Sequence, residues 1–538
     1  MAETRFRITY ATMAADNPEL HEHYERAVET VKSTWLGQKH PFYVDGEERW
    51  GEDTHVERSP IDRDLIVGEF AQGSAQDVRD AIAAARAAFP EWSGRPWQER
   101  VEIMRKAADL IKDRVFELSA LMAIEVGKNR LEALGDVQET AELIEYYCDS
   151  MERNEGFAKP MDRLTDAEFN RDVLRPYGVW GVISPFNFPF ALAGGPVGAA
   201  LVTGNCVVFK PSNAGAAMGV KLYEVLRDGG VPAGAFHLLT GPGSAVGQEI
   251  QDNPGVDGLT FTGSYEVGMG IYRSFAKDFP KPAICEMGGK NPVVVSAKAD
   301  LDKAVEGVAR SAFGFGGQKC SATSRVYVER EVYDEFVERL RARAEQISVG
   351  DPLDKANWLG PVINEDAVKT FLEASDEARG SGRIVFGGER VEKGDLARGN
   401  FVKPTIAEVP LESWIWKKEL FVPFVTVAPV DSIEQGFELA NDTEYGLTAG
   451  FFSEDRSEVD RFLSSIHAGV VYVNRRAGAT TGAWPGYQPF GGWKGSGTTG
   501  KAGGGDYYVQ QYMREQSQTV IDEESDREPA DAGAPGGE

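Results

Sequence analysis

Cysteine is scarce in this chain of 538 residues, and long apolar runs are absent. The four cysteines, Cys148, Cys206, Cys285 and Cys320, lie far apart and form no Cys-x-x-Cys pair. This spacing excludes a zinc knuckle and a dense disulfide framework, and it favours a reducing compartment. No stretch reaches the roughly 18 apolar residues of a membrane helix, and the opening MAETRFRITY has no apolar signal core. We therefore expect a soluble, cytoplasmic protein.

Positive charge is also in short supply. The chain has 57 Lys+Arg against 84 Asp+Glu, a net charge of −27, and a pI near 4.8. Phosphate backbones and anionic membranes repel such a chain unless a basic stripe reverses the field, and none is visible. We expect no nucleic-acid or membrane partner. Arg outnumbers Lys, and together with the excess of carboxylates this favours a salt-adapted origin over ordinary acidic variation.

Apolar residues are sufficient for a large core. Hydrophobic residues make up 42% of the chain and aromatic residues 10%, so most of it should fold, and its length fits two or three packed lobes. Apolar spacing of three and four residues predicts helices over 76–89, 98–125 and 131–150. Short apolar runs predict buried parallel strands at 179–184, 206–210, 236–239 and 258–262.

A second half with the same alternation starts at 291–296 and continues to about residue 487. The predicted fold class is therefore α/β, with two lobes and a ligand cleft between them. Residues 1–40 are typical of a polar arm with a helical patch at about 25–35. The acidic tail, 521–538, is rich in Pro, Gly and Ala and is predicted to be disordered.

Two strand-end motifs point to a nucleotide. The string GxGxxG does not occur, and GPGSAVG (241–247) is one residue too long for it. FTGSYEVG (261–268) instead leads from a strand through Gly263 and Ser264 into a helix, where a phosphate can meet backbone N–H groups. Lys210 of KPSN stands at the carboxyl end of another strand. Taken singly, a capped turn and a solvated lysine are the commoner explanations, whereas together the two motifs make a nucleotide site an equal alternative.

Three further residues are candidates for chemistry. Asn187 lies in the proline-bounded turn SPFNFPF, where its amide could donate to an oxyanion, although such a string is also an ordinary turn. Glu286 stands beside two glycines in CEMGGK. Cys320 lies in the glycine-rich FGFGGQKCSA, whereas the other three cysteines fall in apolar strands or a helix. An accessible loop thiol suits a nucleophile.

Read together, these motifs resemble the NAD(P)-dependent aldehyde dehydrogenase superfamily. The resemblance covers about residues 40–520 and rests on SPFNFP, CVVFKPS, FTGS, EMGGKN, GQKCSA, KELFVP and PFGGWKGSG, in family order and at similar spacing. It implies a Rossmann-like cofactor domain over 41–157 and 177–286 and a catalytic domain over 287–487. It also implies a small β oligomerisation flap from 158–176 and 506–520, and therefore a homo-oligomer.

The resemblance implies the following roles. Cys320 attacks the aldehyde, the Asn187 amide stabilises the oxyanion, and Glu286 activates the water that releases the acid, which needs a raised carboxyl pKa. No metal is implied. The cofactor, NAD with NADP possible, would be held by Ser184, Phe186, Lys210, Ser212, Asn213, Gly243, Gly247, Gly263, Ser264, Glu419 and Phe421.

Within the superfamily, the chain is similar to the branch that oxidises L-glutamate γ-semialdehyde (1-pyrroline-5-carboxylate) in proline catabolism. The similarity rests on GQKCSATSR (317–325), TGAWPGYQPFGG (481–492), SGTTGKAGGGDY (496–507) and the long N-terminal arm. It implies substrate contacts from Phe188, Ser321, Gly482, Ala483 and Phe490.

Three alternatives remain at this stage. They are a semialdehyde dehydrogenase for succinate or a 2-oxo acid, a CoA-acylating enzyme, which would not need Glu286, and a binding protein that kept the fold but lost the chemistry.

Three departures from the family pattern are visible. Asn213 stands where a ribose-binding Glu is usual, so it carries no charge against a 2′-phosphate. The segment NRRAGATTGA (474–483) is about three residues longer than in that branch, by comparison of the motifs. Val422 replaces the glycine that usually follows the cofactor-binding Glu-Phe pair.

Overall fold

The first lobe is built on a seven-stranded sheet in the computed structural model, which describes residues 16–521. Its strands are β2 (Phe42–Val44), β3 (Glu47–Arg49), β8 (Val179–Ile183), β9 (Cys206–Lys210), β10 (Phe236–Leu238), β11 (Gly258–Thr262) and β12 (Ala283–Glu286). The order is β12-β11-β8-β9-β10-β2-β3, parallel from β12 to β10 and antiparallel beyond. The strands expected from the apolar runs are confirmed to within a residue.

Nine helices accompany this sheet in the described chain. They are α1 (Pro18–Thr34), α2 (Ala75–Gly94), α3 (Trp97–Asp113), α4 (Val115–Val126), α5 (Arg130–Arg153), α6 (Ala191–Val202), α7 (Ala216–Gly229), α8 (Gln248–Asp252) and α9 (Tyr265–Ser274). The helix predicted over 98–125 is wrong as a single element, because it breaks at Arg114. There φ and ψ are −103° and 15°, and the side chain pairs with Asp228 at 2.7 Å.

The second lobe repeats the layered plan. Its strands are β13 (Asn291–Val295), β14 (Thr323–Glu329), β15 (Arg383–Phe386), β16 (Thr405–Glu408), β17 (Phe424–Val430), β19 (Thr448–Phe452) and β20 (Val470–Val473). The order is β15-β16-β17-β14-β13-β19-β20, with β15 antiparallel to its neighbour. The helices are α10 (Leu301–Phe313), α11 (Arg330–Glu345), α12 (Glu365–Ser381), α13 (Ile433–Asn441) and α14 (Arg456–Ser465).

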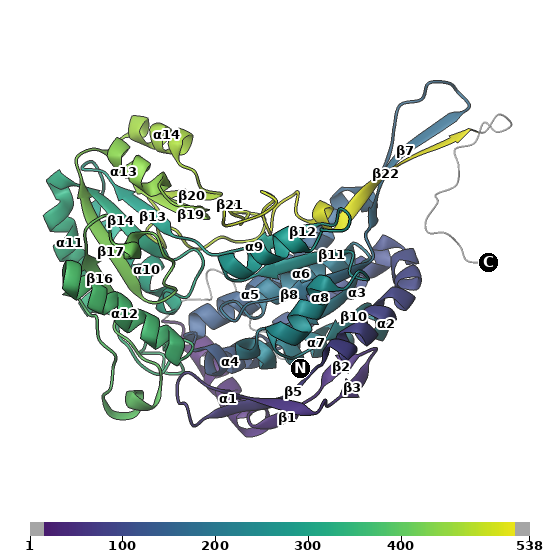
Figure 1. Ribbon diagram of the computed structural model, residues 1–538, viewed down its shortest axis with the longest axis horizontal. Helices are drawn as coiled ribbons and strands as arrows, with labels where there is room; N and C mark the ends of the chain where they lie inside the picture. The colour runs from purple at the N-terminus through teal and green to yellow at the C-terminus, as the bar shows by residue number, and fades with distance from the viewer. Residues whose placement is uncertain (1–15, 522–538) are drawn as a thin grey trace.

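Alternate side chains of the interior strand β13 enter two separate cores. Val293 and Val295 pack with α10 and α11, whereas Val294 packs with α12, α13 and α14. The sheet is therefore covered on both faces, as a parallel sheet must be. Figure 1 shows the two lobes side by side, with the second lobe at the left in green.

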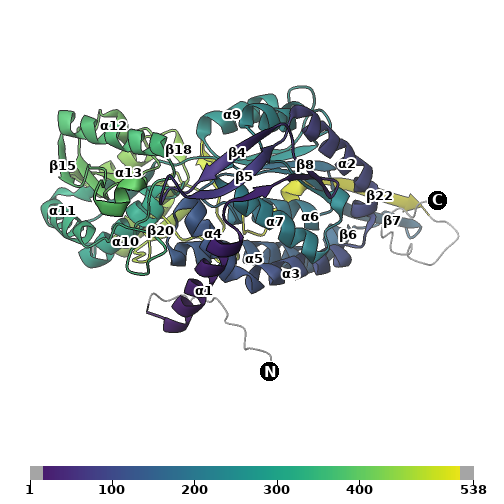
Figure 2. The ribbon, with the colours of Figure 1, turned by 90° about the horizontal axis from the view of Figure 1, so that it is seen from below.

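A three-stranded antiparallel sheet forms an arm. It consists of β6 (Ala158–Pro160), β7 (Glu168–Pro176) and β22 (Met513–Ile521), in the order β22-β7-β6. The arm projects from the first lobe on the side away from the second lobe (Figures 1 and 2). The strand expected over 506–520 starts only at Met513, because Val509 and Tyr512 are buried in a short 3₁₀ turn and the Tyr512 hydroxyl contacts Thr260 Oγ1 at 3.1 Å.

The remaining elements are short. One small sheet has three strands in the order β1 (Gln38–His40), β5 (Ile66–Gln72) and β4 (Asp53–Arg58). Another consists of the two strands β18 (Tyr445–Gly446) and β21 (Trp493–Lys494). The single-turn helices are η1 (Glu155–Phe157), η2 (Asn213–Gly215), η3 (Ala233–Ala235), η4 (Gly243–Gly247), η5 (Gly314–Gly317), η6 (Gly394–Arg398), η7 (Trp414–Trp416) and η8 (Val509–Tyr512).

The two ends of the chain are described in part. The helical patch expected in the N-terminal arm lies in α1, while residues 1–15 fall outside the described residues. The predicted disordered tail, 521–538, also lies outside them except for Ile521, which ends β22. Between residues 16 and 521, no helix combines the length and the apolar character that crossing a bilayer requires.

Candidate active site

Cys320 lies just after a glycine-rich turn that connects α10 to β14. Phe315, Gly316 and Gly317 have φ values of 48°, 62° and 66°, a left-handed path that glycine adopts without strain. A Cβ atom on Gly317 would lie 2.3 Å from the carbonyl oxygen of Val422. Only glycine therefore allows the turn to approach this segment so closely.

Side chains of the second lobe fix the backbone around Cys320. Asn291 Nδ2 donates to the carbonyl oxygens of Cys320 at 2.7 Å and Ala322 at 2.9 Å. Thr480 Oγ1 donates to the carbonyl oxygen of Ser321 at 2.6 Å. These bonds leave the nucleophile loop little freedom to move.

The Cys320 thiol differs from the other three thiols. Cys320 is half-buried and the other three are buried, as the sequence predicts. Burial, together with smaller contributions from the Glu419 and Glu286 carboxylates, raises the pKa of the Cys320 thiol to about 12, and nearby backbone N–H groups oppose the shift. The thiol keeps its proton at neutral pH until a base removes it.

Glu286 ends β12, directly beside Thr262 of β11. Its Oε2 accepts a hydrogen bond from the Gly492 N–H at 3.2 Å. Burial raises the pKa of the Glu286 carboxyl to about 8, and the Gly492 N–H partly opposes this. Cys285 and Met287, its neighbours in the chain, are both buried. A carboxyl with this pKa can take and release a proton near neutrality.

The proline-bounded turn lies between β8 and α6. Asn187 is only 3% exposed. The ring of Phe186 meets the ring of Phe421 edge to face, with 5.9 Å between the centroids. The turn of the first lobe therefore contacts the Glu419–Phe421 segment of the second.

The carboxyl ends of β8 and β9 lie side by side and carry two predicted cofactor residues. The Ser184 N–H donates to the Lys210 carbonyl oxygen at 3.1 Å. Ser184 Oγ is buried and has no hydrogen-bond partner. Burial lowers the pKa of Lys210 to about 8, and its Nζ donates only to the neighbouring Pro211 carbonyl oxygen, at 3.0 Å. A buried hydroxyl and a buried amine with spare hydrogen-bonding capacity fit a polar ligand at this edge.

The turn at 243–247 lies next to Lys210. Gly247 approaches the lysine so closely that a Cβ atom there would lie 3.7 Å from Lys210 Cδ, while Gly243 is exposed. Ser212 Oγ accepts from the Ala214 N–H at 3.3 Å and so starts η2, whose first residue is Asn213. These residues surround the end of β9.

Gly263 and Ser264 connect β11 to α9. The Gly263 N–H donates to the Glu286 carbonyl oxygen at 3.1 Å. Ser264 Oγ accepts from the Val267 N–H at 3.4 Å and caps α9, as the sequence predicts. The turn thus places a helix N-terminus, which favours anions, beside the strand that ends in Glu286.

Glu419 reaches the same region from the second lobe. Its Oε1 accepts from the Gly289 N–H at 2.9 Å, and a Cβ atom on Gly288 would lie 2.1 Å from its Oε2. Burial raises the pKa of Glu419 to about 7, while the Gly289 bond and Lys290 lower it. Phe421 has a φ of 58°, in the left-handed region. It directly precedes Val422, the residue that stands where the family usually has glycine.

Arg475 shapes the lengthened loop 474–483. Its guanidinium donates to the carbonyl oxygens of Thr481 and Gly482, the latter at 3.1 Å. Gly482 has a φ of 102°, and a Cβ atom there would lie 2.5 Å from Arg475 Nη1. Ala483 follows half-buried. The extra residues therefore fold around an arginine rather than extending outward.

The two predicted aromatic walls come from different elements. Phe490 exchanges two backbone hydrogen bonds with Gly503, at 2.9 and 2.8 Å. The Phe188 ring lies under Lys128 Nζ, 3.6 Å from the ring centroid. Both side chains are half-buried.

The structure brings Cys320, Glu286 and Glu419 within electrostatic reach of one another. A charged cluster that was not predicted from the sequence lies beside them. It is formed by residues on one face of α5 and by residues that pack against this face. The spacing of the three acids along the chain (i, i+4, i+7) is the signal that would have identified it. Its members are Lys128, Glu132, Asp136, Glu139 and Lys319.

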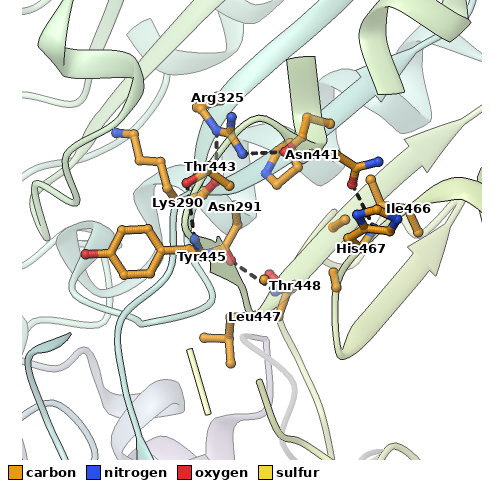
Figure 3. Close-up of a pocket in the computed structure, with 15 residues that line it drawn as sticks. Lys290, Asn291, Arg325, Asn441, Thr443, Tyr445, Leu447, Thr448, Ile466 and His467 are labelled. Carbon is orange, nitrogen blue, oxygen red and sulfur yellow. Dashed lines mark hydrogen bonds between the residues drawn. The ribbon is translucent and has the colours of Figure 1, made fainter. Parts of the chain in front are cut away.

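A small pocket lies behind the nucleophile loop (Figure 3). Buried Arg325 donates to the carbonyl oxygens of Lys290 and Ala440, both at 2.8 Å. Asn291 lines it and accepts from the Thr448 N–H at 3.1 Å. In Figure 3 the Lys290 side chain points away from Arg325. Because Asn291 also donates a hydrogen bond to the Cys320 carbonyl oxygen, this polar network supports the nucleophile loop.

No metal site is formed by the part of the chain from residue 16 to residue 521, where no group of three or more His, Cys, Asp or Glu side chains could hold an ion.

Comparison with known proteins places the chain in a family. It belongs to the aldehyde dehydrogenase family, whose model matches residues 49–518. The chain is 39% identical to a 1-pyrroline-5-carboxylate dehydrogenase of Bacillus licheniformis over 491 residues, 90% of this chain and 93% of the relative. It is 38% identical to the protein of that name from Geobacillus kaustophilus, over 93% of this chain and 96% of the relative.

A solved structure gives the same result. The 1-pyrroline-5-carboxylate dehydrogenase from Thermus with bound NAD superposes with a TM-score of 0.90 at 34% identity, over 97% of this chain and all of that one. The expected α/β fold of aldehyde dehydrogenases and the expected enzyme class, an NAD(P)-dependent aldehyde dehydrogenase, are confirmed.

Proposed function

We propose that this protein oxidises L-glutamate γ-semialdehyde, the open form of 1-pyrroline-5-carboxylate, to L-glutamate with NAD, as the last step of proline catabolism. One observation carries the proposal. A half-buried thiol, Cys320, follows a left-handed glycine turn within electrostatic reach of two buried carboxyls, Glu286 and Glu419. The relatives named above, which cover nearly all of the chain, support the choice of substrate.

The first step is acylation of Cys320. Sγ attacks the aldehyde carbon, a C–S bond forms, and the C=O electron pair moves to the oxygen. The thiol proton passes to the Glu286 carboxylate, because the raised thiol pKa disfavours a free thiolate. The Asn187 amide and the Cys320 N–H donate to the developing oxyanion.

NAD bound here would supply the hydride acceptor, and loss of the hydride from the substrate carbon would leave a thioester on Cys320. Several groups fit this cofactor. Lys210 would hold the adenosine ribose, and the α9 N-terminus at Gly263 and Ser264 would hold the pyrophosphate. Glu419, in its glycine cradle, would hold the nicotinamide ribose, with Phe421 against the ring. The buried, unpartnered Ser184 hydroxyl is a further donor on the same edge.

The second step is hydrolysis of the thioester. Glu286 first gives the thiol proton to solvent, and its carboxylate then takes a proton from water while the water oxygen attacks the acyl carbon. The C–S bond then breaks, the acid leaves, and the sulfur regains a proton. The pKa of Glu286, about 8, suits a group that must both accept and return a proton in each cycle.

Substrate recognition falls to the loop beyond the nucleophile. The α-carboxylate would be held by the Ser321 hydroxyl and the backbone N–H groups of Gly482 and Ala483. Phe188 and Phe490 would flank the aliphatic chain. Support comes from the Arg475 hydrogen bonds, which hold the carbonyl oxygens of this loop and leave its N–H groups available.

A substrate panel tests the proposal. Initial rates of NADH formation are compared for L-glutamate γ-semialdehyde, succinate semialdehyde and propionaldehyde, with NAD and with NADP, at low and high salt. We expect the highest kcat/KM for L-glutamate γ-semialdehyde with NAD. A higher kcat/KM for succinate semialdehyde would overturn the substrate.

We further propose that the arm mediates a homo-oligomer. Met161 and Leu164, in the hairpin between β6 and β7, are 54% and 90% exposed, and Ile521, at the end of β22, is 59% exposed. A second subunit would cover these apolar side chains. Analytical ultracentrifugation of a variant lacking β22 should show smaller particles than the wild type.

A cytoplasmic location remains a prediction, with which four free cysteines agree.

A further inference from the structure

An ion pair outside the roles assigned above lies beneath the candidate site. Lys128 follows the left-handed cap of α4, Gly127, and Asp136 lies on α5. Lys128 Nζ is 2.6 Å from Asp136 Oδ2, and both side chains are 0% exposed. Burying a charged pair completely is costly, so its place in the fold calls for an explanation.

The Lys128 ammonium lies against two aromatic rings that belong to different lobes. Nζ is 3.6 Å from the centroid of Phe188 and 4.9 Å from the centroid of Phe315. Phe188 follows Asn187 in the chain, and Phe315 begins the left-handed turn that leads to Cys320. A cation held against both rings attracts both in a site that excludes water.

Asp136 binds both Lys128 and the end of the turn that carries Phe188. Its Oδ2 binds Lys128, and its Oδ1 accepts from the N–H of Ala191, the first residue of α6, at 2.8 Å. Both carboxylate oxygens are therefore occupied. The bond to Ala191 fixes the carboxyl end of the turn that carries Asn187 and Phe188.

Glu132, one turn earlier on α5, holds the nucleophile loop. Its Oε2 accepts from the Phe315 N–H at 3.1 Å, and its Oε1 accepts from Lys319 Nζ at 2.7 Å. Lys319 immediately precedes Cys320. One face of α5 thus contacts the oxyanion turn through Asp136 and the nucleophile loop through Glu132, and Lys128 joins the two.

We propose that Lys128 and Asp136 are positioning residues, which hold the Asn187–Phe188 turn against the Cys320 loop and so set the separation of the oxyanion donor from the nucleophile. The inference rests on the proposed roles of Asn187 and Cys320. Neither member of the pair contacts the reacting atoms. The rate of acylation depends on this separation, whereas cofactor affinity does not.

The test uses three variants of the full-length protein. Lys128→Met removes the cation, Lys128→Met/Asp136→Asn removes both charges, and Phe315→Leu removes one ring while the ion pair stays. Lys221→Met is the matched control, because Lys221 also contacts an aromatic ring (Trp35, 4.1 Å) and a carboxylate (Glu224, 2.9 Å).

The readouts are the rate of the first NADH turnover by stopped flow and the KM for NAD. Each is measured with L-glutamate γ-semialdehyde and with propionaldehyde. We expect each of the three variants to lose about tenfold or more in the first-turnover rate with either aldehyde, on the order of a misplaced reacting group. The KM for NAD should change less than about twofold. Lys128→Arg should recover part of the rate, and Lys221→Met should match the wild type.

Two results would overturn the inference. One is a double variant that has the wild-type rate, which would show that the two residues only neutralise each other's charge. The other is a folded Lys128→Met or Phe315→Leu variant with an unchanged rate. Should Lys128→Met not fold, the double variant and Phe315→Leu still decide. A wrong substrate proposal gives a different pattern, in which wild type itself oxidises propionaldehyde but not L-glutamate γ-semialdehyde.

Discussion

Glu286 is the residue whose protonation limits the proposed reaction. Its pKa is raised to about 8 by burial, and only the carboxylate form can accept a proton from water. Below pH 8 the active fraction should therefore fall about tenfold per pH unit, and above pH 8 it should level off. We predict that kcat, measured from pH 6 to pH 10, rises with pH and then reaches a plateau. A kcat that is flat between pH 6 and pH 8 would exclude Glu286 as the base.

Arg475 determines the shape of the proposed carboxylate anchor. It donates to the carbonyl oxygens of Thr481 and Gly482, so its loss should release the loop. We predict that Arg475→Met raises the KM for L-glutamate γ-semialdehyde about tenfold or more, because a charge-assisted site is lost. The KM for propionaldehyde, which has no carboxylate, should stay within about twofold.

The neighbouring exposed arginine provides the control. Arg476→Met changes the same charge but removes no bond to the loop. Equal increases in KM for both aldehydes in Arg475→Met, or an equal effect of Arg476→Met, would show that the loop does not hold the carboxylate.

Single residues also show what the sequence could and could not predict about the site. Cys320 was identifiable because glycines surround it, and the three other cysteines because apolar residues surround them. Lys128 was not identifiable, because its partners Phe188 and Phe315 are distant in the chain and meet only in the folded protein. The raised thiol pKa was not predictable either, since it depends on burial in the folded protein and on Glu419 and Glu286 from other elements.

At the scale of elements, the N-terminus of α7 is held by a buried pair of acids. Glu125 of α4 accepts from the Ala217 and Met218 N–H groups at 2.6 and 3.3 Å. Glu57 of β4 lies beside it with both oxygens buried and without a hydrogen-bond donor. Burial raises the pKa of Glu125 to about 7 and that of Glu57 well above its usual value. We infer that the two acids share one proton.

This pair makes stability depend on pH. A carboxyl with a raised pKa binds its proton more tightly in the folded state, so its contribution to stability is complete below pH ~4.3 and is lost as pH rises through the folded pKa. We predict that Glu57→Gln, which supplies a permanent donor, raises the free energy of unfolding by about 1–2 kcal/mol at pH 8. At pH 5 the effect should be small.

Urea unfolding at the two pH values measures this effect. Glu47→Gln, in which an exposed carboxylate of β3 is replaced, is the control and should change little at either pH. A Glu57→Gln variant that is less stable than wild type at pH 8 would show that the two acids do not share a proton.

Elements also differed in how far the sequence predicted them. The strands β9 and β11 were predictable at both ends because continuous apolar runs stop at polar residues. The break between α3 and α4 was not, because the apolar stripe continues across Arg114 and both helices pack into one core. The late start of β22 depends on Tyr512, whose burial against β11 is a tertiary contact.

At the scale of the whole molecule, the net charge of −27 dominates the surface. Surface ion pairs such as Arg390–Glu365 offset part of it, but 84 acidic residues outnumber 57 basic ones. Salt shortens the screening length from about 10 Å at 0.1 M to about 3 Å at 1 M and so weakens the repulsion. We predict that Tm rises by roughly 5 °C or more between 0.1 and 1 M KCl.

Differential scanning fluorimetry measures this shift. Sucrose at equal osmolality is the control, because it favours the compact state without screening charge. A Tm that falls with KCl, or that rises equally with sucrose, would contradict a surface limited by charge repulsion.

The most direct test of the central claim is to trap the acyl group on Cys320. Glu286→Gln lacks the base for both steps, so with L-glutamate γ-semialdehyde and NAD it should form about one NADH per subunit slowly, as hydroxide removes the thiol proton, and then stop. Peptide mass spectrometry after an acid quench should find the acyl group on Cys320 and on none of the other three cysteines. Sustained NADH formation by this variant, or an acyl group on a different residue, would contradict the account.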